Sequence, residues 1–211
     1  MSYNIEIIKK HQQKISKWTG GTTNEIYIYP VESLYGERNF KWRISSAKIE
    51  EEHSTFTSLP GISRLIMVIE GKLLLKHEGH HNAELSPFEQ DSFSGEWTTI
   101  SSGKVIDFNL MLTQGYKGSL ESISFYKGEV KDISLHNNEN DPEEYSQIIE
   151  AFYVVTGNIQ ICTGMKEKTS LFQGDIAIVT RTEKKETTEF KIHSSNDEET
   201  KIIKASIFYY E

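Results

Sequence analysis

The 211-residue chain has a single cysteine and fewer basic than acidic residues. Because Cys162 has no partner in the chain, an internal disulfide is excluded, and its place among isoleucines in a β-rich run predicts a packed thiol. The 31 acidic and 23 basic residues give a net charge of −8. This charge argues against nucleic acid and anionic membrane surfaces as partners, since both attract basic proteins.

Long hydrophobic runs are also lacking. The longest aliphatic stretches, such as residues 65–69, are far too short to cross a bilayer. The first residues, MSYNIEIIKKHQQ, are polar and lack the apolar core of a signal peptide. Together with the lone cysteine, these absences predict a soluble protein of the reducing cytoplasm.

What the sequence has instead is a series of short alternating strands. In TNEIYIYP (23–30) and FKWRISSA (40–47), apolar and polar residues alternate. Similar runs recur along the chain with Gly, Asn, Asp or Pro between most of them, which is typical of a sandwich or barrel. Helical periodicity is weak and predicts only a turn or two at residues 4–14 and 142–150.

The chain also contains a degenerate repeat. VIEGKLLL (68–75) aligns with VVTGNIQI (154–161) at an offset of 86 residues. If two residues are inserted in the first copy, Asp91 and Asp175 take matching places in the turns that follow. This layout, occurring twice, indicates a duplicated β-barrel.

The repeat and the composition between its copies predict three segments. We expect an N-terminal barrel over residues 1–126 and an acidic connection over 127–147. A C-terminal barrel over 148–211 would be completed by strands from the N-terminal part.

The hairpin glycine and the turn after it resemble those of cupins. Metal-dependent cupins carry His-x-His and then a glutamate on the strand before that glycine. Before Gly71 this chain has only His53, and Arg64 stands about where the glutamate would fall. A guanidinium repels a cation and cannot ligate it. In the second half Glu150 lies near the acid position without the histidines, so neither barrel assembles the ligands.

Three further histidines, His77, His80 and His81, lie in HEGHHNAE. Gly79 and Asn82 in the same stretch favour a solvated loop between strands over a metal site. We therefore predict no metal and no cofactor.

Five segments of the first half carry a family resemblance. They are WTGGTTNEIYIYP (18–30), FKWRISSAKIE (40–50), FTSLPGISRLIMVIEG (56–71), PFEQDSFSGEW (87–97) and GKVIDFNLM (103–111). In this order they resemble the HutD/Ves family of small bacterial proteins, over roughly residues 3–126. The resemblance implies an all-β bicupin, that is two RmlC-like jelly-roll (double-stranded β-helix) barrels with few short helices. It also implies a small-ligand-binding or regulatory role, linked to histidine utilisation in one branch and stress response in the other.

The motif segments place polar side chains at period two on otherwise apolar strands. Such a pattern fits a solvated outer face or a polar-lined pocket, and we favour the pocket because the family motifs concentrate on these residues. Arg64 is the main candidate, since its forked donors match a carboxylate; a structural pair with Glu70 or Asp107 is the alternative. The candidate ligand-binding residues are Arg64, Arg43, Ser45, Asp107, Asn109, Thr23, Glu25 and Glu70.

These residues lead to the hypothesis of a non-enzymatic protein that binds a small carboxylate metabolite. The HutD resemblance suggests formylglutamate or urocanate. No catalytic residue is predicted, because no serine has a histidine and an acid at recognisable spacing. A cupin enzyme, metal-free like some epimerases or with an irregular metal site, and a purely structural interaction module both stay open. So does a homodimer, since cupins often pair through β-strands.

Overall fold

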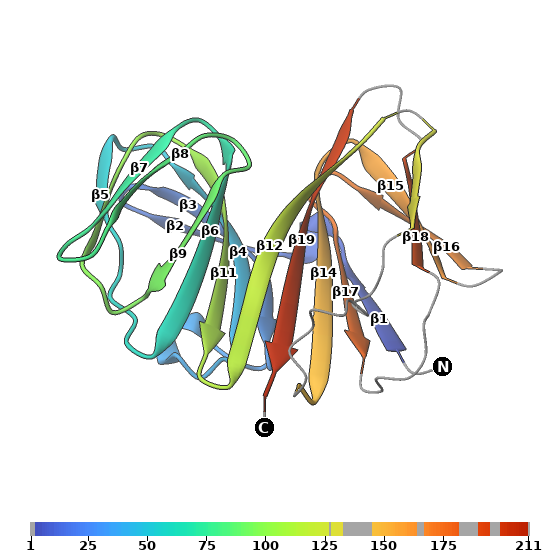
Figure 1. Cartoon of the computed structure of the whole chain (residues 1–211), viewed down its shortest axis with the longest axis horizontal. Coiled ribbons are helices and arrows are strands. Elements are labelled where there is room, and N and C mark those ends of the chain that lie inside the picture. Colours follow the sequence, from blue (N-terminus) through green and yellow to red (C-terminus); the bar gives the residue numbers. More distant parts are fainter. Residues whose placement is uncertain are drawn as a thin grey trace. The chain divides into compact units, whose positions relative to one another are not determined.

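The computed structural model describes residues 3–126, 128–132, 145–163, 167–181, 190–194 and 199–210. These residues form antiparallel β-sheets with two short 3-10 helices, η1 (Lys10–Gln12) and η2 (Tyr35–Glu37). Figure 1 shows strands throughout the described chain. The prediction of an all-β fold is confirmed.

Contacts divide the chain into two compact units. The N-terminal barrel is residues 13–116 and the C-terminal barrel is residues 1–12 with 117–211. The strands of the N-terminal barrel are β2 (Lys14–Trp18), β3 (Gly21–Tyr29), β4 (Trp42–Ile49), β5 (His53–Thr55), β6 (Ile62–Glu70), β7 (Leu73–His77), β8 (Asn82–Leu85), β9 (Gln90–Ser94), β10 (Thr99–Ser102) and β11 (Ile106–Thr113). The strands of the C-terminal barrel are β1 (Tyr3–Ile8), β12 (Tyr116–Phe125), β13 (Val130–Asp132), β14 (Gln147–Thr156), β15 (Asn158–Thr163), β16 (Glu167–Phe172), β17 (Ile176–Arg181), β18 (Phe190–Ser194) and β19 (Thr200–Tyr209).

Each barrel consists of a larger and a smaller sheet. In the N-terminal barrel the sheets have the orders β2-β3-β4-β11-β6-β9 and β5-β10-β7-β8. In the C-terminal barrel the orders are β1-β17-β14-β19-β12 and β13-β18-β15-β16. The central trio β4-β11-β6 positions the polar residues of the candidate site.

The structural units differ from the sequence-based ranges in where two segments belong. Residues 1–12 and 117–126 group with the C-terminal barrel, because they carry β1 and most of β12. The predicted connection at 127–147 falls largely outside the described residues, so its role stays a prediction.

The repeat holds at one constant offset across its strands. Phe88 N and Gly174 N donate to Val68 O at 2.7 Å and Val154 O at 2.8 Å. Val68 N and Val154 N in turn donate to Glu89 O and Asp175 O at 3.1 and 3.0 Å. Glu89 is therefore the counterpart of Asp175, and no insertion is needed.

Asp91 consequently has a different counterpart from the one predicted. It pairs with Ile66 in the β6–β9 register, whereas Ala177 pairs with Phe152 in the β14–β17 register. The predicted match of Asp91 with Asp175 is wrong, because backbone pairing decides the alignment and two acids stand close together in the first copy. The carboxylate of Asp91 has no equivalent in the second barrel.

The hairpin glycines occur where the repeat predicts them. Gly71 and Gly157 have φ of 89° and 78°, values that side chains disfavour. A Cβ on Gly71 would also lie 2.4 Å from Lys104 O. Glycine at this turn therefore allows the strands to reverse closely.

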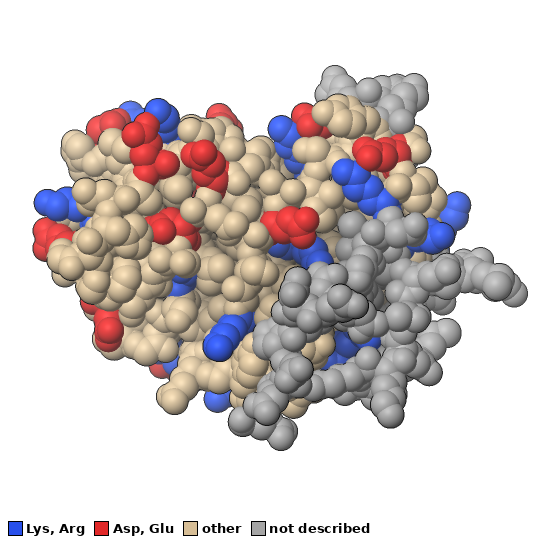
Figure 2. Space-filling model, viewed as in Figure 1, with Lys and Arg blue, Asp and Glu red and all other residues tan. Residues whose placement is uncertain are grey.

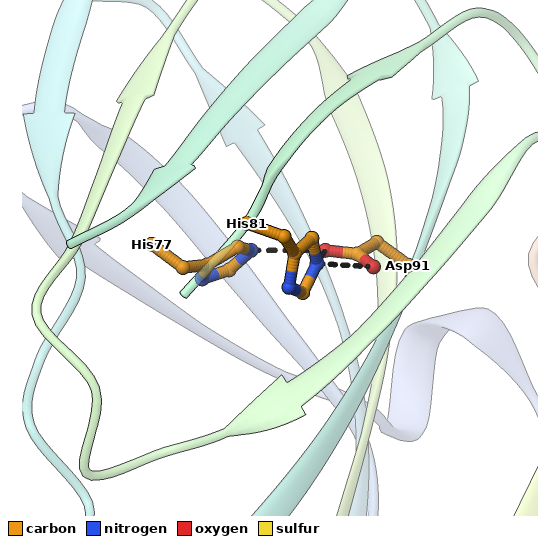
Figure 3. A group of neighbouring side chains, drawn as sticks. All are labelled: His77, His81 and Asp91. Carbon is orange, nitrogen blue, oxygen red and sulfur yellow. Dashed lines mark hydrogen bonds and ion pairs between the residues drawn. The ribbon is translucent and has the colours of Figure 1, made fainter. Parts of the chain in front are cut away.

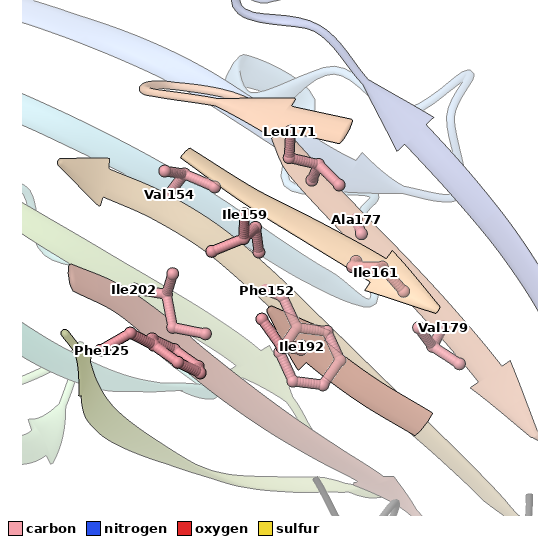
Figure 4. Packing of buried hydrophobic residues seen from close by; sticks show 10 residues of the cluster. All are labelled: Phe125, Phe152, Val154, Ile159, Ile161, Leu171, Ala177, Val179, Ile192 and Ile202. Carbon is pink, nitrogen blue, oxygen red and sulfur yellow. The ribbon is translucent and has the colours of Figure 1, made fainter. Parts of the chain in front are cut away.

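The core of the C-terminal barrel shows how strand alternation fills the interior. Phe152 and Val154 on β14 face the same side and pack with Ile161 of the smaller sheet. Figure 4 shows these side chains and their neighbours gathered between the strands. Burial of such aliphatic and aromatic groups is the main stabilising contribution to each unit.

The two predicted helical segments are mainly strands. Residues 3–8 form β1, and only residues 10–12 make a helical turn. Residues 147–150 begin β14, so a helix there is wrong over the described part of the segment. Both segments are short, and pairing with neighbouring strands overrides weak local helical periodicity.

The surface and the helices add two observations. On the face drawn in Figure 2, acidic and basic side chains of the described residues are interspersed. Neither described helix approaches the length or apolar character needed to traverse a bilayer.

Cys162 lies on β15, is partly exposed and is a free thiol.

Candidate functional site

A cavity of about 330 Å³ lies within the N-terminal barrel. The central strands β4, β6 and β11 supply its polar wall, since alternate residues of a barrel strand face inward. Six of the predicted site residues line it: Arg64, Arg43, Ser45, Asp107, Asn109 and Thr23. The strands thus bring together residues that are far apart in the sequence.

Arg43 is held in place by neighbouring side chains. Its Nε donates to Glu25 Oε2 at 2.8 Å, and its Nη1 donates to Ser45 Oγ at 2.9 Å. Its guanidinium also lies 4.3 Å from the centre of the Tyr35 ring. These contacts pair its charge and engage its Nε and Nη1, so Arg43 serves to shape the wall. Glu25 is not a lining residue and acts through Arg43.

Arg64 is in the opposite situation. It is 7% exposed, yet its side chain makes no hydrogen bond or ion pair within the described part of the chain, and its Nε is buried without a partner. The guanidinium lies 4.5 Å from the ring centre of Phe56 and 5.1 Å from that of Phe93. Burial lowers the pKa of Arg64 to about 10, so the group stays charged at neutral pH. A charged fork of donors therefore faces the cavity unused.

Asp107 and Asn109 lie on β11, the strand that pairs with the β6 strand of Arg64. Asp107 is 3% exposed and its Oδ1 accepts a hydrogen bond from Ala47 N at 3.2 Å. Burial raises its pKa to about 6, although that hydrogen bond and the charges of Arg64 and Arg43 act in the other direction. The Oδ1 of Asn109 is buried without a hydrogen-bond partner. The cavity wall thus carries the Arg64 guanidinium and the Asn109 Oδ1, each without a hydrogen-bond partner on the buried atom. It also carries the Asp107 carboxyl group, whose pKa is about 6.

The remaining predicted residues divide between the rim and the outside. Thr23 Oγ1 accepts a hydrogen bond from Trp18 Nε1 at 3.1 Å at the cavity edge. Glu70 is exposed at the end of β6 and is not among the lining residues. The alternative in which Glu70 pairs with Arg64 is therefore wrong, and Asp107 interacts with Arg64 only at longer range through its charge.

The aromatic part of the wall was missed by the sequence reasoning. Phe56 and Tyr35 line the cavity, and Phe93 lies behind the lining. All three rings approach the two arginines face-on. Phe56 and Phe93 lie inside the family segments, but a phenylalanine in such β-rich sequence usually belongs to the core. Only the spatial meeting with a buried arginine distinguishes them.

The histidine stretch also differs from its prediction as a solvated loop. His77 ends β7 and is buried, whereas His81 in the following turn is exposed. His80 stacks on Trp97 with ring centres 3.7 Å apart. The solvated-loop interpretation is wrong for His77, because it is the last residue of β7 and its side chain faces the same buried side as those of Leu73 and Leu75.

Comparison with known families decides what kind of protein carries this site. The sequence profile of the HutD family matches residues 10–197. The chain belongs to the HutD family. Its recognition from the motifs of the first half is confirmed.

A Pseudomonas putida protein, described as an uncharacterized 21.2 kDa protein in the hutC 3' region, is 36% identical to this HutD-family chain over 107 residues. That stretch is 48% of this chain and 54% of the relative, so the match spans about half of the relative's length. HutD from Pseudomonas fluorescens, solved in a formate condition, is 20% identical, with a TM-score of 0.69 over 99% of this chain and 100% of its own.

A mutant of oxalate decarboxylase from Bacillus subtilis has the same architecture. It is 7% identical, with a TM-score of 0.64 over 97% of this chain and 78% of its own. At these identities the structural likeness shows the fold alone. The predicted bicupin fold is confirmed.

Proposed function

We propose that the N-terminal barrel of this HutD-family protein binds a small carboxylate metabolite, with Arg64 as the anion anchor. The observation that carries the proposal is the buried guanidinium on the cavity wall without a hydrogen-bond or ion-pair partner within the described residues. Burying an unpaired charge is costly, and a carboxylate that fills the cavity would relieve that cost. Guanidinium and carboxylate also match in geometry, because both are planar and two-pronged.

The neighbours of Arg64 support an anion over a cation. Arg43 already has Glu25 as its partner, so it adds a neutral pair to the wall. Asp107 opposes an anion when ionised, but its pKa of about 6 lets it take up a proton when an anion enters. Once protonated it becomes a donor, and Asn109 offers an acceptor for a second polar group on the ligand.

The size of the cavity and the family suggest which carboxylate. A volume of about 330 Å³ is near the lower end of ligand pockets, which suits a metabolite of a few carbons. Formylglutamate and urocanate, carboxylates of histidine utilisation, fit both the site and the family. The role we propose is regulatory, in histidine utilisation or the stress response, through ligand binding without catalysis. It would act in the cytoplasm without nucleic-acid or membrane partners, as a monomer or a homodimer.

Calorimetry on the whole chain tests this proposal, with formylglutamate, urocanate and formate as the probes. We expect at least one to bind, and Arg64→Met to weaken it by about 10- to 100-fold, the loss of one charge-assisted interaction. Arg38→Met is the matched control, because Arg38 is an exposed arginine of the same barrel, and it should bind as the wild type does. Equal affinity of Arg64→Met and wild type, or no binding of any probe, would sink the proposal.

One observation keeps an enzymatic role as a second candidate. Asp107 is a buried cavity acid whose pKa of about 6 suits general acid–base catalysis near neutral pH. A cofactor-free isomerase would use it to move a proton on the bound ligand. Exchange of ligand C–H protons in deuterated water, followed by NMR, distinguishes the two: exchange that Asp107→Asn abolishes supports the enzyme, and its absence supports the binder.

A further inference from the structure

Three side chains converge at a second place in the N-terminal barrel. His77 at the end of β7, His81 in the turn after it and Asp91 on β9 point toward one another (Figure 3). The Nε2 of His77 lies 2.9 Å from Asp91 Oδ2, and the Nε2 of His81 lies 3.0 and 3.1 Å from Oδ1 and Oδ2. One ligand atom from each residue lies within 4.8 Å of the others.

The fold of the turn does not require this carboxylate. In the second barrel the side chain of Asp175 accepts a hydrogen bond from Phe172 N at 3.0 Å, and in the first barrel Glu89 accepts one from Ser86 N at 2.7 Å. Glu89 therefore performs the turn-closing role, and the register places Ala177 opposite Phe152 where Asp91 stands opposite Ile66. At the offset of 86, His77 and His81 correspond to Thr163 and Glu167. The trio is thus an addition to the first barrel.

The inner histidine is oriented from behind. His77 Nδ1 lies 2.8 Å from Thr99 Oγ1, so with an ion bound the hydroxyl can accept a hydrogen bond from Nδ1–H, in the tautomer that leaves Nε2 as the ligand. Burial lowers the pKa of His77, although the hydrogen bond and the charge of Asp91 act in the other direction. The Phe93 and Trp97 rings pack beside it at 4.5 and 5.7 Å between ring centres.

We propose that His77, His81 and Asp91 form a binding site for a divalent transition-metal ion of the zinc class. Two imidazoles and one carboxylate are ligands that such ions accept. Tetrahedral ligands about 2.0–2.1 Å from zinc stand roughly 3.3 Å apart, so the 2.9–3.1 Å contacts to Asp91 need to open only slightly. The ion would take the place of the hydrogen bonds that now join the Nε2 atoms to the carboxylate.

The exposure of the trio fits an ion that enters from solvent. The side chain of His77 is 0% exposed, that of Asp91 14% and that of His81 43%. His81 can therefore move to complete the set, and the remaining coordination position would hold water or another small ligand. The site departs from the prediction of no metal, which was based on the ligand positions of other cupins and on a solvated histidine loop.

Titration of the whole chain with Co²⁺ and Zn²⁺ tests this site. Co²⁺ bound by nitrogen and oxygen ligands gives visible absorption bands, which Zn²⁺ should then displace, and Zn²⁺ should raise the melting temperature. We expect His81→Ala to weaken Zn²⁺ binding by at least 10- to 100-fold, the size of effect known even for residues behind the ligands. Because His81 is exposed, this variant should fold.

His53→Ala is the matched control, because His53 is an exposed histidine of the same barrel whose Nδ1 lies 2.9 Å from Ser102 Oγ. It should bind Zn²⁺ as the wild type does. Zn²⁺ affinity that is unchanged in His81→Ala, or a wild-type chain that binds neither ion, would overturn the proposal. Carboxylate binding at Arg64 is measured separately, so failure of one site leaves the other result intact.

Discussion

Arg64 and Glu150 occupy the same position in the two barrels. Arg64 on β6 pairs with Met111 on β11, and Glu150 on β14 pairs with Ser206 on β19. Both side chains are buried, and the two positions are 86 residues apart, the offset of the repeat. One framework thus holds a cation in the first barrel and an anion in the second.

The neighbouring strand determines what happens to each charge. Two residues away in the register, the first barrel has Asn109 and the second has Lys204. Lys204 Nζ lies 3.0 Å from Glu150 Oε1, and the two residues are 6% and 1% exposed. In the first barrel Asn109 is neutral and leaves Arg64 without an ion pair among the described residues.

If the first barrel binds a carboxylate as proposed, this difference separates two roles within a duplicated fold. A buried charge that is paired within the protein stabilises its own surroundings and has little left for a ligand. A buried charge that is left unpaired next to a cavity has a cost that a ligand of opposite charge relieves. The comparison therefore favours the first barrel as the binding unit and the second as a structural one.

Removing one partner of the internal pair is the strongest test of this comparison. Glu150→Gln leaves Lys204 buried without its countercharge, and we expect the free energy of unfolding to fall by about 3–5 kcal/mol. Urea unfolding followed by circular dichroism gives the value. The double variant Glu150→Gln with Lys204→Met should recover part of the loss.

Arg64→Met is the counterpart at the equivalent position. Because Arg64 has no ion-pair partner among the described residues, we expect its removal to change the free energy of unfolding by less than about 1 kcal/mol, the loss of its aromatic contacts being offset by relief of burial. Equal losses at positions 64 and 150 would contradict the distinction between an unpaired and a paired charge.

Much of this arrangement could be predicted from sequence. The hairpin glycines gave the offset of the repeat, and period-two alternation placed Asp107 and Asn109 on one face of β11. Arg64 stood out because it replaces an acid that a metal-binding cupin would need. Its lack of a partner could not be predicted, since pairing depends on which side chains of β4 and β11 reach it in space.

The two acids near the start of β9 show a second limit of prediction from the sequence. Glu89 and Asp91 are two residues apart, and either could close the turn as far as the sequence shows. The backbone pairing of β6 with β9 was needed to assign that role to Glu89 and to place Asp91 with His77. Likewise, His77 looked solvated because its neighbours Glu78 and Gly79 are typical of a turn.

Asp107, a buried acid of the first barrel, gives a smaller, pH-dependent effect. Burial raises the pKa of Asp107 from 3.8 to about 6, so between these pH values the native chain holds a proton that the unfolded chain has released. Its stabilising contribution is therefore present at low pH and is lost as the pH rises toward 6. The shift corresponds to roughly 2–3 kcal/mol.

Asp107→Asn should lack this contribution. Urea unfolding at about pH 4 and about pH 7 should show the wild type losing roughly 2–3 kcal/mol relative to the variant as the pH rises. Glu50→Gln, which removes an exposed acid just after β4, should show no such relative loss. A difference between wild type and Asp107→Asn that stays constant with pH would mean that Asp107 is not buried in its neutral form.

The turns before β9 and β17 give another small expected effect. Phe88 and Gly174 are equivalent and have φ of 68° and 91°, where a residue with a side chain is strained by about 1–2 kcal/mol. We expect Gly174→Ala to lower the free energy of unfolding by about 1 kcal/mol; its Cβ would meet Lys10 Cδ at 2.6 Å, a flexible side chain that can move. Phe88→Gly should change it by less than about 1 kcal/mol, because relief of strain offsets the lost packing of a partly buried ring. If urea unfolding instead shows a large loss for Phe88→Gly, the ring itself holds the first turn in place, and the two barrels stabilise the same backbone turn by different means.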